Sequence, residues 1–232
     1  MKAATDAILD VWKAMGGVNF FGGDRLPTQP ETLDGIGYFS KLPKGILYWT
    51  PTEDVHVSHG NIFIKWADMD VNSTSSAHVL GFPTSNEMKK GNGIISHFER
   101  GAIYCNDAGD TFEIHGPIYR KWLALGGTDS ILGAPVSDVR TGDKYSFINF
   151  KRGMIWFGHS TSNDVVCGPF EVHGGIYEKW QSLGGFGKTS EGAPGPGFPL
   201  CDEIGEANQE RYSVFENGKI TWSQRHGTRY SK

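Results

Sequence analysis

The stretch His59-Gly60-Asn61-Ile62-Phe63-Ile64-Lys65-Trp66 decides the fold, because it recurs along the chain. The pattern His-Gly-x-Ile-x-x-Lys-Trp is found again at 115–122 and at 173–180, and a fainter copy, 8–12, opens the sequence. Its tryptophans therefore stand at intervals of roughly 56 residues, a period that indicates one supersecondary unit per repeat. We expect a single repeat domain over 1–232, made of four repeats at about 5–58, 59–114, 115–172 and 173–232.

Each copy of the pattern predicts a short amphipathic helix. In the third repeat Ile118, Trp122 and Leu125 follow at i, i+4 and i+7, which is one apolar helical face. In three repeats a pair of glycines comes next, and glycine ends a helix in the left-handed conformation at little steric cost. We expect these helices to pack on a sheet through their tryptophans, which are Trp12, Trp66, Trp122 and Trp180.

A Gly-aromatic-Pro turn and a set of alternating segments follow each helix. In the third repeat 145–150 and 154–157 have the pattern of two hairpin strands, and 170–172 is a third strand that leads into the next His-Gly. The sequence therefore predicts a mainly β protein with short helices. Each repeat would consist of one short helix plus a three-stranded antiparallel meander.

The four repeats are expected to form a propeller-like array, because radial closure leaves only short, protected sheet edges. The chain begins within a helix that lacks the His-Gly lead-in, and it ends with Arg225-His226-Gly227. This terminal His-Gly is expected to supply the missing lead-in to the first helix.

The Leu80-Gly81-Phe82-Pro83 run, taken with the repeated helix pattern and the Gly-x-Ile-aromatic strand, resembles the LGFP repeat family over about residues 5–223. In that family the repeats are cell-envelope modules appended to bacterial enzymes such as mycoloyltransferases and peptidoglycan amidases, and they are associated with attachment to cell-wall polysaccharide. The resemblance implies a compact, propeller-like array. This sequence departs from the pattern in having neither a catalytic domain nor an export signal, which is more similar to the cytoplasmic defence lectins of fungi.

Composition narrows the possible partners. The formal charge is −4 and the charges are interspersed, so neither nucleic acid nor an anionic membrane is an expected partner. The N-terminus carries charge where a signal peptide needs an apolar run, and no stretch is long enough to span a bilayer. We expect no membrane insertion and a cytoplasmic location, or an extracellular one if a signal peptide has been removed. The oligomeric state stays open.

The cysteines do not recur with the repeat, so we expect free thiols and no disulfide or zinc site at Cys105, Cys167 and Cys201. The repeated histidines, His59, His115 and His173, stand at strand-to-helix junctions, where we expect them to cap exposed backbone groups and not to bind metal. No cofactor is expected.

The candidate binding residues are aromatic side chains that end the second strand of each repeat next to a polar turn. An aromatic ring can cover the apolar face of a sugar while carboxylates and amides bind its hydroxyl groups. Packing in the core or between repeats is the alternative role for these rings. The predicted ligand-binding residues are Trp49, Tyr104, Trp156 and Trp222, with Asp107, Asp110 and Asn163 as polar partners.

Sequence motifs for catalysis are absent: there is no Gly-x-Ser-x-Gly, no His-Glu-x-x-His, no phosphate loop and no Cys-x-x-Cys. We therefore expect no enzymatic activity and no catalytic residue. The sequence favours a carbohydrate-binding protein, a lectin with repeated shallow glycan sites that is either a defence lectin or a binder of cell-wall polysaccharide. A non-enzymatic scaffold or inhibitor is the alternative. A glycan hydrolase is the third possibility, because sequence spacing would not reveal its carboxylate pair.

Overall fold

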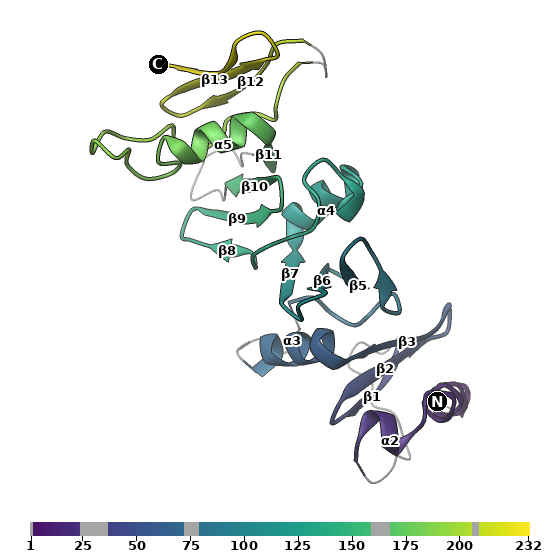
Figure 1. The fold of residues 1–232 in the computed structure, drawn as a ribbon. Coiled ribbons are helices and arrows are strands. Elements are labelled where there is room, and N and C mark those ends of the chain that lie inside the picture. Colours follow the sequence, from purple (N-terminus) through teal and green to yellow (C-terminus); the bar gives the residue numbers. More distant parts are fainter. Residues whose placement is uncertain (1, 24–36, 72–78, 159–167, 206–208) are drawn as a thin grey trace. The chain divides into compact units, whose positions relative to one another are not determined.

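The computed structural model describes residues 2–23, 37–71, 79–158, 168–205 and 209–232. They form four antiparallel sheets of three or four strands together with short helices, so the mainly β fold predicted from the sequence is confirmed (Figure 1). Contacts divide the chain into an N-terminal half, Met1–His115, and a C-terminal half, Gly116–Lys232. None of the four described sheets closes into a barrel. No helix in the described part of the chain is long and apolar enough to cross a membrane.

The N-terminal half contains the first two sheets, in the orders β1-β2-β3 and β4-β5-β6-β7. Its elements are α1 (Lys2–Ala14), α2 (Val18–Phe21), β1 (Tyr38–Leu42), β2 (Gly45–Thr50), β3 (Glu53–His59), α3 (Gly60–Val71), β4 (Met88–Lys89), β5 (Gly93–Phe98), β6 (Gly101–Asn106) and β7 (Thr111–His115).

The C-terminal half contains the other two sheets, in the orders β8-β9-β10-β11 and β12-β13-β14. The two-residue strands β4 and β8 add an edge to the meanders of the second and third sheets. The elements of this half are α4 (Gly116–Ala124), a 3-10 turn (Gly127–Asp129), β8 (Arg140–Thr141), β9 (Tyr145–Phe150), β10 (Gly153–Gly158), β11 (Phe170–His173), α5 (Gly174–Ser182), β12 (Arg211–Phe215), β13 (Gly218–Ser223) and β14 (Gly227–Ser231).

The recurring His-Gly dipeptide is the junction between a third strand and the next helix. β3, β7 and β11 each end at the histidine, and α3, α4 and α5 each begin at the glycine. These glycines are left-handed, with φ of 54°, 64° and 52° at Gly60, Gly116 and Gly174. A Cβ atom there would meet nothing within 4 Å. The motif therefore requires glycine for its backbone conformation and not for lack of space.

One of the three repeated histidines, His173, does not have the predicted capping role. His173 occupies the N-cap position of α5 but makes no capping hydrogen bond with its side chain. Its Nδ1 lies 3.4 Å from Glu203 Oε2, and His115 Nδ1 lies 2.6 Å from Glu113 Oε2. The capping prediction is thus wrong for His173.

The helix tryptophans tie each helix to the turn that follows it. Trp66, Trp122 and Trp180 are buried, which confirms the predicted core role for these three. Trp12 is only half-buried, and its Nε1 has no partner among the described residues. The other three indole Nε1 groups donate to the glycine carbonyl of the Leu-Gly-x-Pro or Gly-Phe-Pro turn, at 2.9 Å for Trp66 to Gly81, 3.1 Å for Trp122 to Gly133 and 2.9 Å for Trp180 to Gly197.

The same turn is also held by the hairpin of its own repeat. In the second repeat the backbone N–H groups of Glu99 and Arg100 donate to Phe82 O and Leu80 O at 3.0 and 2.8 Å. The Glu99 carboxylate accepts the Phe82 N–H at 3.3 Å. Glu216 accepts the equivalent bond from Phe198 in the fourth repeat at 3.0 Å. Helix, turn and hairpin therefore form one hydrogen-bonded unit in each of these repeats.

The C-terminal His-Gly does not have the predicted structure. His226 lies in the turn between β13 and β14, and Gly227 begins β14, where it pairs with Ser223. The segment after it completes the fourth sheet, and Tyr230 packs against the core of that repeat. The expectation that this dipeptide leads into a helix is wrong, because a third strand was still needed to complete the last sheet. A propeller-like arrangement of the repeats stays a prediction.

Cys105 and Cys201 are free thiols, and Cys167 lies outside the described residues. Cys201 takes the place of a serine, because its Sγ accepts the Val214 N–H at 3.4 Å as Ser137 Oγ accepts the Asn149 N–H at 3.1 Å. We expect a reducing agent to leave the melting temperature unchanged and Cys201→Ser to keep the fold, as measured by circular dichroism. A loss of many degrees on reduction would reveal a disulfide worth some 2–4 kcal/mol and contradict this.

Candidate functional site

A groove of about 570 Å3 lies at the turn between β2 and β3 in the first repeat. Trp49 stands one residue from the end of β2, and the pairing of β2 with β3 shifts register between Tyr48 and Thr50. Such irregularities re-aim side chains at a strand end. The groove is lined by Trp49, Thr50, Pro51, Thr52, Glu53, Asp54, His56 and Thr84.

Trp49 supplies the aromatic surface of this groove. The indole is half-buried and packs against Tyr38, with 6.1 Å between ring centroids. It belongs to the margin of the first repeat's core, which fixes its position while part of the ring remains accessible. Trp49 is therefore a predicted aromatic residue that lines a groove.

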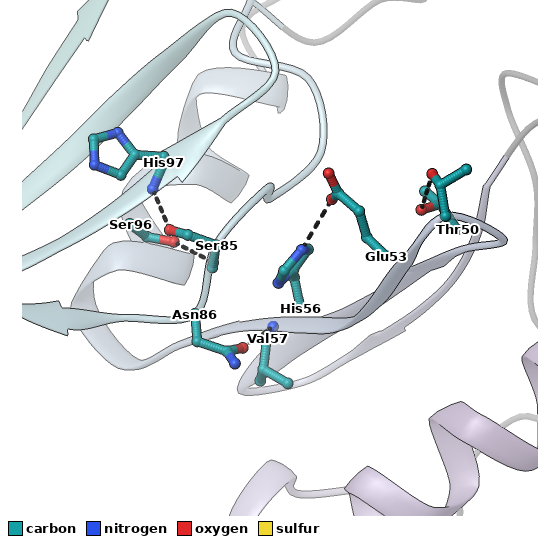
Figure 2. Close-up of polar contacts among 9 residues, drawn as sticks. Thr50, Glu53, His56, Val57, Ser85, Asn86, Ser96 and His97 are labelled. Carbon is teal, nitrogen blue, oxygen red and sulfur yellow. Dashed lines mark hydrogen bonds and ion pairs between the residues drawn. The ribbon is translucent and has the colours of Figure 1, made fainter. Parts of the chain in front are cut away.

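Polar groups surround the indole. His56 Nε2 lies 3.0 Å from Glu53 Oε2, and the Thr50 and Thr52 hydroxyls lie 3.4 Å apart. Figure 2 shows the side chain of Glu53 directed toward that of His56. Asp54 is exposed beside them. Carboxylate and hydroxyl oxygens are thus within the lining, whereas no lysine or arginine contributes to it. The groove suits a neutral or positively charged polar ligand.

One lining residue, Thr84, comes from the second repeat, and hydrogen bonds fix the segment that follows it. Ser85 Oγ accepts the His97 N–H at 2.9 Å, and Asn86 Oδ1 accepts the Val57 N–H at 2.9 Å (Figure 2). Glu87 Oε1 accepts the His59 N–H at 3.0 Å. The segment after the Gly-Phe-Pro turn is therefore bonded both to β3 and to β5. Thr84, directly before it, is held at the groove.

The other predicted aromatic residues lie elsewhere. Tyr104 and Trp156 are only 4% and 6% exposed. Trp156 stacks on Phe198, with 5.1 Å between ring centroids. Trp222 is half-buried and lies under the Arg211 guanidinium, 4.4 Å from the ring centroid. These positions correspond to the packing role that the sequence left as the alternative, and we do not keep them in the proposed site.

The predicted polar partners stabilise a turn. Asp107 forms an ion pair with Lys89 at 2.8 Å, and Asp110 Oδ2 accepts a bond from Asn106 Nδ2 at 3.0 Å. Asn106 Oδ1 in turn accepts the N–H groups of Ala108 and Asp110. Both aspartates are exposed. Asn163 lies outside the described residues.

Of the eight residues that line the groove, the sequence predicted only Trp49, and the seven that were missed include the polar residues Glu53, Asp54 and His56. A signal was present, since a polar turn follows Trp49 just as polar turns follow Tyr104 and Trp156. The missing information was which aromatic ring stays accessible, and that depends on packing from distant parts of the chain.

A second polar cluster lies in the C-terminal half. Lys121 Nζ is 2.9 Å from Glu171 Oε2 and 2.6 Å from Asp202 Oδ2. Burial and the adjacent Asp202 raise the pKa of Glu171 to about 7. Burial acts to raise the pKa of Asp202 too, but hydrogen bonds from Glu171 and Lys121 keep it below its usual value. One lysine thus neutralises the more exposed carboxylate, while the buried one favours its proton.

This cluster joins two consecutive repeats and has a structural counterpart. Asp202 Oδ1 accepts the Glu171 N–H at 3.0 Å, the bond that Asn86 makes to Val57 in the N-terminal half. The cluster therefore serves the junction between repeats. Among the described residues, no group of three or more His, Cys, Asp or Glu side chains could hold a metal ion.

The recurring helix, glycine turn and meander define a tandem-repeat protein built from small antiparallel sheets. The model of the LGFP repeat family matches residues 26–73 and 80–130, which identifies two LGFP repeats in the chain. Residues of the third and fourth repeats reproduce the same tryptophan-to-glycine hydrogen bond as the second. No curated protein matches the chain.

Proposed function

We propose that this protein binds carbohydrate without transforming it, and that the groove at Trp49 is a shallow glycan site. The observation that carries the proposal is a partly exposed indole in a groove whose other walls carry carboxylates, hydroxyls and an imidazole. The C–H face of a sugar would lie on the ring, and its hydroxyl groups would donate to Glu53 and Asp54. The ligand class is a glycan or cell-wall polysaccharide.

This single glycan site differs from the repeated shallow sites that the sequence predicted. The equivalent rings Tyr104 and Trp156 are buried and Trp222 is half-buried under the Arg211 guanidinium, so we place the proposed site at the first repeat. A single shallow site gives modest affinity unless several copies of the protein act together on a polymeric ligand. A scaffold or inhibitor role is the competing function, and a protein that binds no glycan would favour it.

We expect Trp49→Ala to weaken glycan binding at least roughly tenfold while leaving the circular dichroism spectrum unchanged, because Trp49 lies at the margin of the core. The glycan is chosen on an array and binding is then measured by titration calorimetry. Trp49→Phe should retain part of the affinity, since it keeps an aromatic face. Unchanged binding in Trp49→Ala would exclude this groove as the glycan site.

The contribution of the Glu53 carboxylate to glycan binding can be tested separately from that of the Trp49 ring. Glu53→Gln keeps the shape of the side chain but removes a charge-assisted hydrogen bond, a loss of about 1.5–3 kcal/mol. Asp107→Asn, in the exposed turn of the second repeat, is the matched control and should bind as the original protein does. Equal losses in both variants would point to a general charge effect.

A further inference from the structure

A second groove, of about 400 Å3, lies in the N-terminal half and shares none of its lining with the glycan site. Its lining residues come from α2, the β1–β2 turn, the end of β3 and the start of α3. The lining is predominantly apolar, and the volume is within the range of small-molecule sites. Its residues are Phe20, Pro43, Lys44, His59, Gly60 and Ile64.

Lys44 can be compared with the residues at the equivalent hairpin position of the other three repeats. In the other three repeats the residue at this position of the hairpin turn uses its side chain to bind a backbone carbonyl. In the first repeat α2 stands where the other repeats have the segment that carries this carbonyl, and the Lys44 backbone N–H donates to Phe21 O at 3.0 Å. The Lys44 ammonium has no hydrogen bond or ion pair among the described residues. The three equivalent bonds are Arg100 Nε to Val79 O at 3.2 Å, Arg152 Nη2 to Ser130 O at 2.5 Å and Asn217 Nδ2 to Gly195 O at 2.9 Å.

The repeat also shows that Ile64 is unusual. The equivalent positions of α4 and α5 hold Arg120 and Glu178, as expected for a solvent-facing position. Ile64 is nevertheless 55% exposed, and Phe20, which also lines the groove, is 40% exposed. Two large apolar side chains therefore line one groove, and at the Ile64 position the third and fourth repeats carry charge instead. An exposed apolar surface in a groove favours the binding of a ligand.

The walls are held in position before any ligand arrives. The Phe20 ring meets the His59 ring edge to face, with centroids 5.0 Å apart at 82°. His59 is itself held by Glu87, whose Oε1 accepts its backbone N–H at 3.0 Å and whose Oε2 lies 3.6 Å from its Nε2. Because Glu87 already faces His59, Lys44 is the cation in this lining that a ligand anion would meet.

We propose that this groove binds a soluble hydrophobic carboxylic acid. The apolar body of the acid lies between Phe20 and Ile64, and its carboxylate meets the ammonium group of Lys44. An apolar wall with one cation favours an amphiphile with one negative charge. A neutral ligand would form no ion pair with the Lys44 ammonium, and a cationic ligand would be repelled by it. The inference does not depend on the glycan site, because the two grooves share no residue.

The test uses three ten-carbon probes below their micellar concentrations: decanoate, decanol and decyltrimethylammonium. Binding to the full chain is followed by titration calorimetry and by the amide chemical shifts of Gly60 and Ile64. We expect decanoate to bind at least roughly tenfold more tightly than decanol and the ammonium compound not to compete, because one charge-assisted bond separates the first two. Equal affinity for all three probes, or no binding of decanoate, would overturn the proposal.

Two variants assign the parts of the groove. Lys44→Gln should reduce decanoate affinity to that of decanol and leave decanol unchanged. Ile64→Ser should weaken both probes together, because it removes apolar surface without adding a charge. Lys13→Gln on α1 and Leu123→Ser on α4 alter exposed residues of the same kinds outside the groove and should have no effect. Equal effects of Lys13→Gln and Lys44→Gln would contradict a defined carboxylate contact.

Anionic vesicles distinguish the source of the acid. Phosphatidylglycerol vesicles present negative charge and acyl chains in a bilayer, whereas decanoate is free. We expect binding to the free acid without sedimentation with the vesicles. Sedimentation with vesicles, lost in Lys44→Gln, together with no binding of decanoate, would assign the groove to a membrane surface and refute our proposal. Glycan binding should be the same in all of these variants, so failure here leaves the glycan site untouched.

Discussion

Trp122→Ala should lower the free energy of unfolding by about 3–5 kcal/mol, the usual range for deleting a buried aromatic side chain. Trp122 is fully buried and stacks on Phe150, with 6.0 Å between ring centroids. Its removal also leaves the Gly133 carbonyl, which accepts the indole N–H at 3.1 Å, without this partner in the interior. Urea denaturation followed by far-ultraviolet circular dichroism measures the change.

Trp12→Ala is the matched control, at the equivalent position of the first repeat. Trp12 is half-buried and its Nε1 has no partner among the described residues. We therefore expect a smaller loss, about 1–2 kcal/mol, because less apolar surface returns to water and no hydrogen bond is broken. Equal losses at the two positions would show that the tryptophan-to-glycine bond does not hold the repeat together.

Glu171→Gln should become more stable relative to the original protein as the pH rises, by about 2–3 kcal/mol between pH 5 and pH 8. Glu171 is buried, and its folded-state pKa of about 7 lies above the ordinary value of 4.5. Between these two values the folded protein holds a proton that the unfolded chain has lost. The stability that Glu171 contributes is therefore present at low pH and is lost as the pH rises through 7. Glutamine carries no such titration.

The pH dependence of the stability of the original protein would not reveal the contribution of Glu171 by itself. Burial, assisted by Arg211, lowers the pKa of His173 to about 4. Between pH 4 and 6.5 the unfolded chain holds the extra proton at this histidine, so its contribution to stability rises with pH and opposes that of Glu171. The difference between variant and original protein at each pH isolates Glu171. Glu178→Gln, an exposed position on α5, is the control. Parallel pH curves for Glu171→Gln and the original protein would contradict a protonated, buried Glu171.

The repeated elements were predictable because their requirements are local. A left-handed glycine after His59, an apolar side chain every three or four residues, and a tight turn between alternating strands depend on neighbours along the chain. The same reasoning failed at His226-Gly227, where the dipeptide was the same but a strand followed it. There the pairing of β14 with β13 decided the structure.

The sequence by itself determined the repeat, its mainly β elements and the buried role of Trp66, Trp122 and Trp180. It did not separate Trp49 from Trp156, because both end a second strand next to a polar turn. Only the tertiary structure decided that Phe198 covers Trp156 while Trp49 remains at a groove. The physical reason is that periodicity reports which face of an element is apolar, whereas the exposure of a ring depends on side chains brought to it from distant parts of the chain.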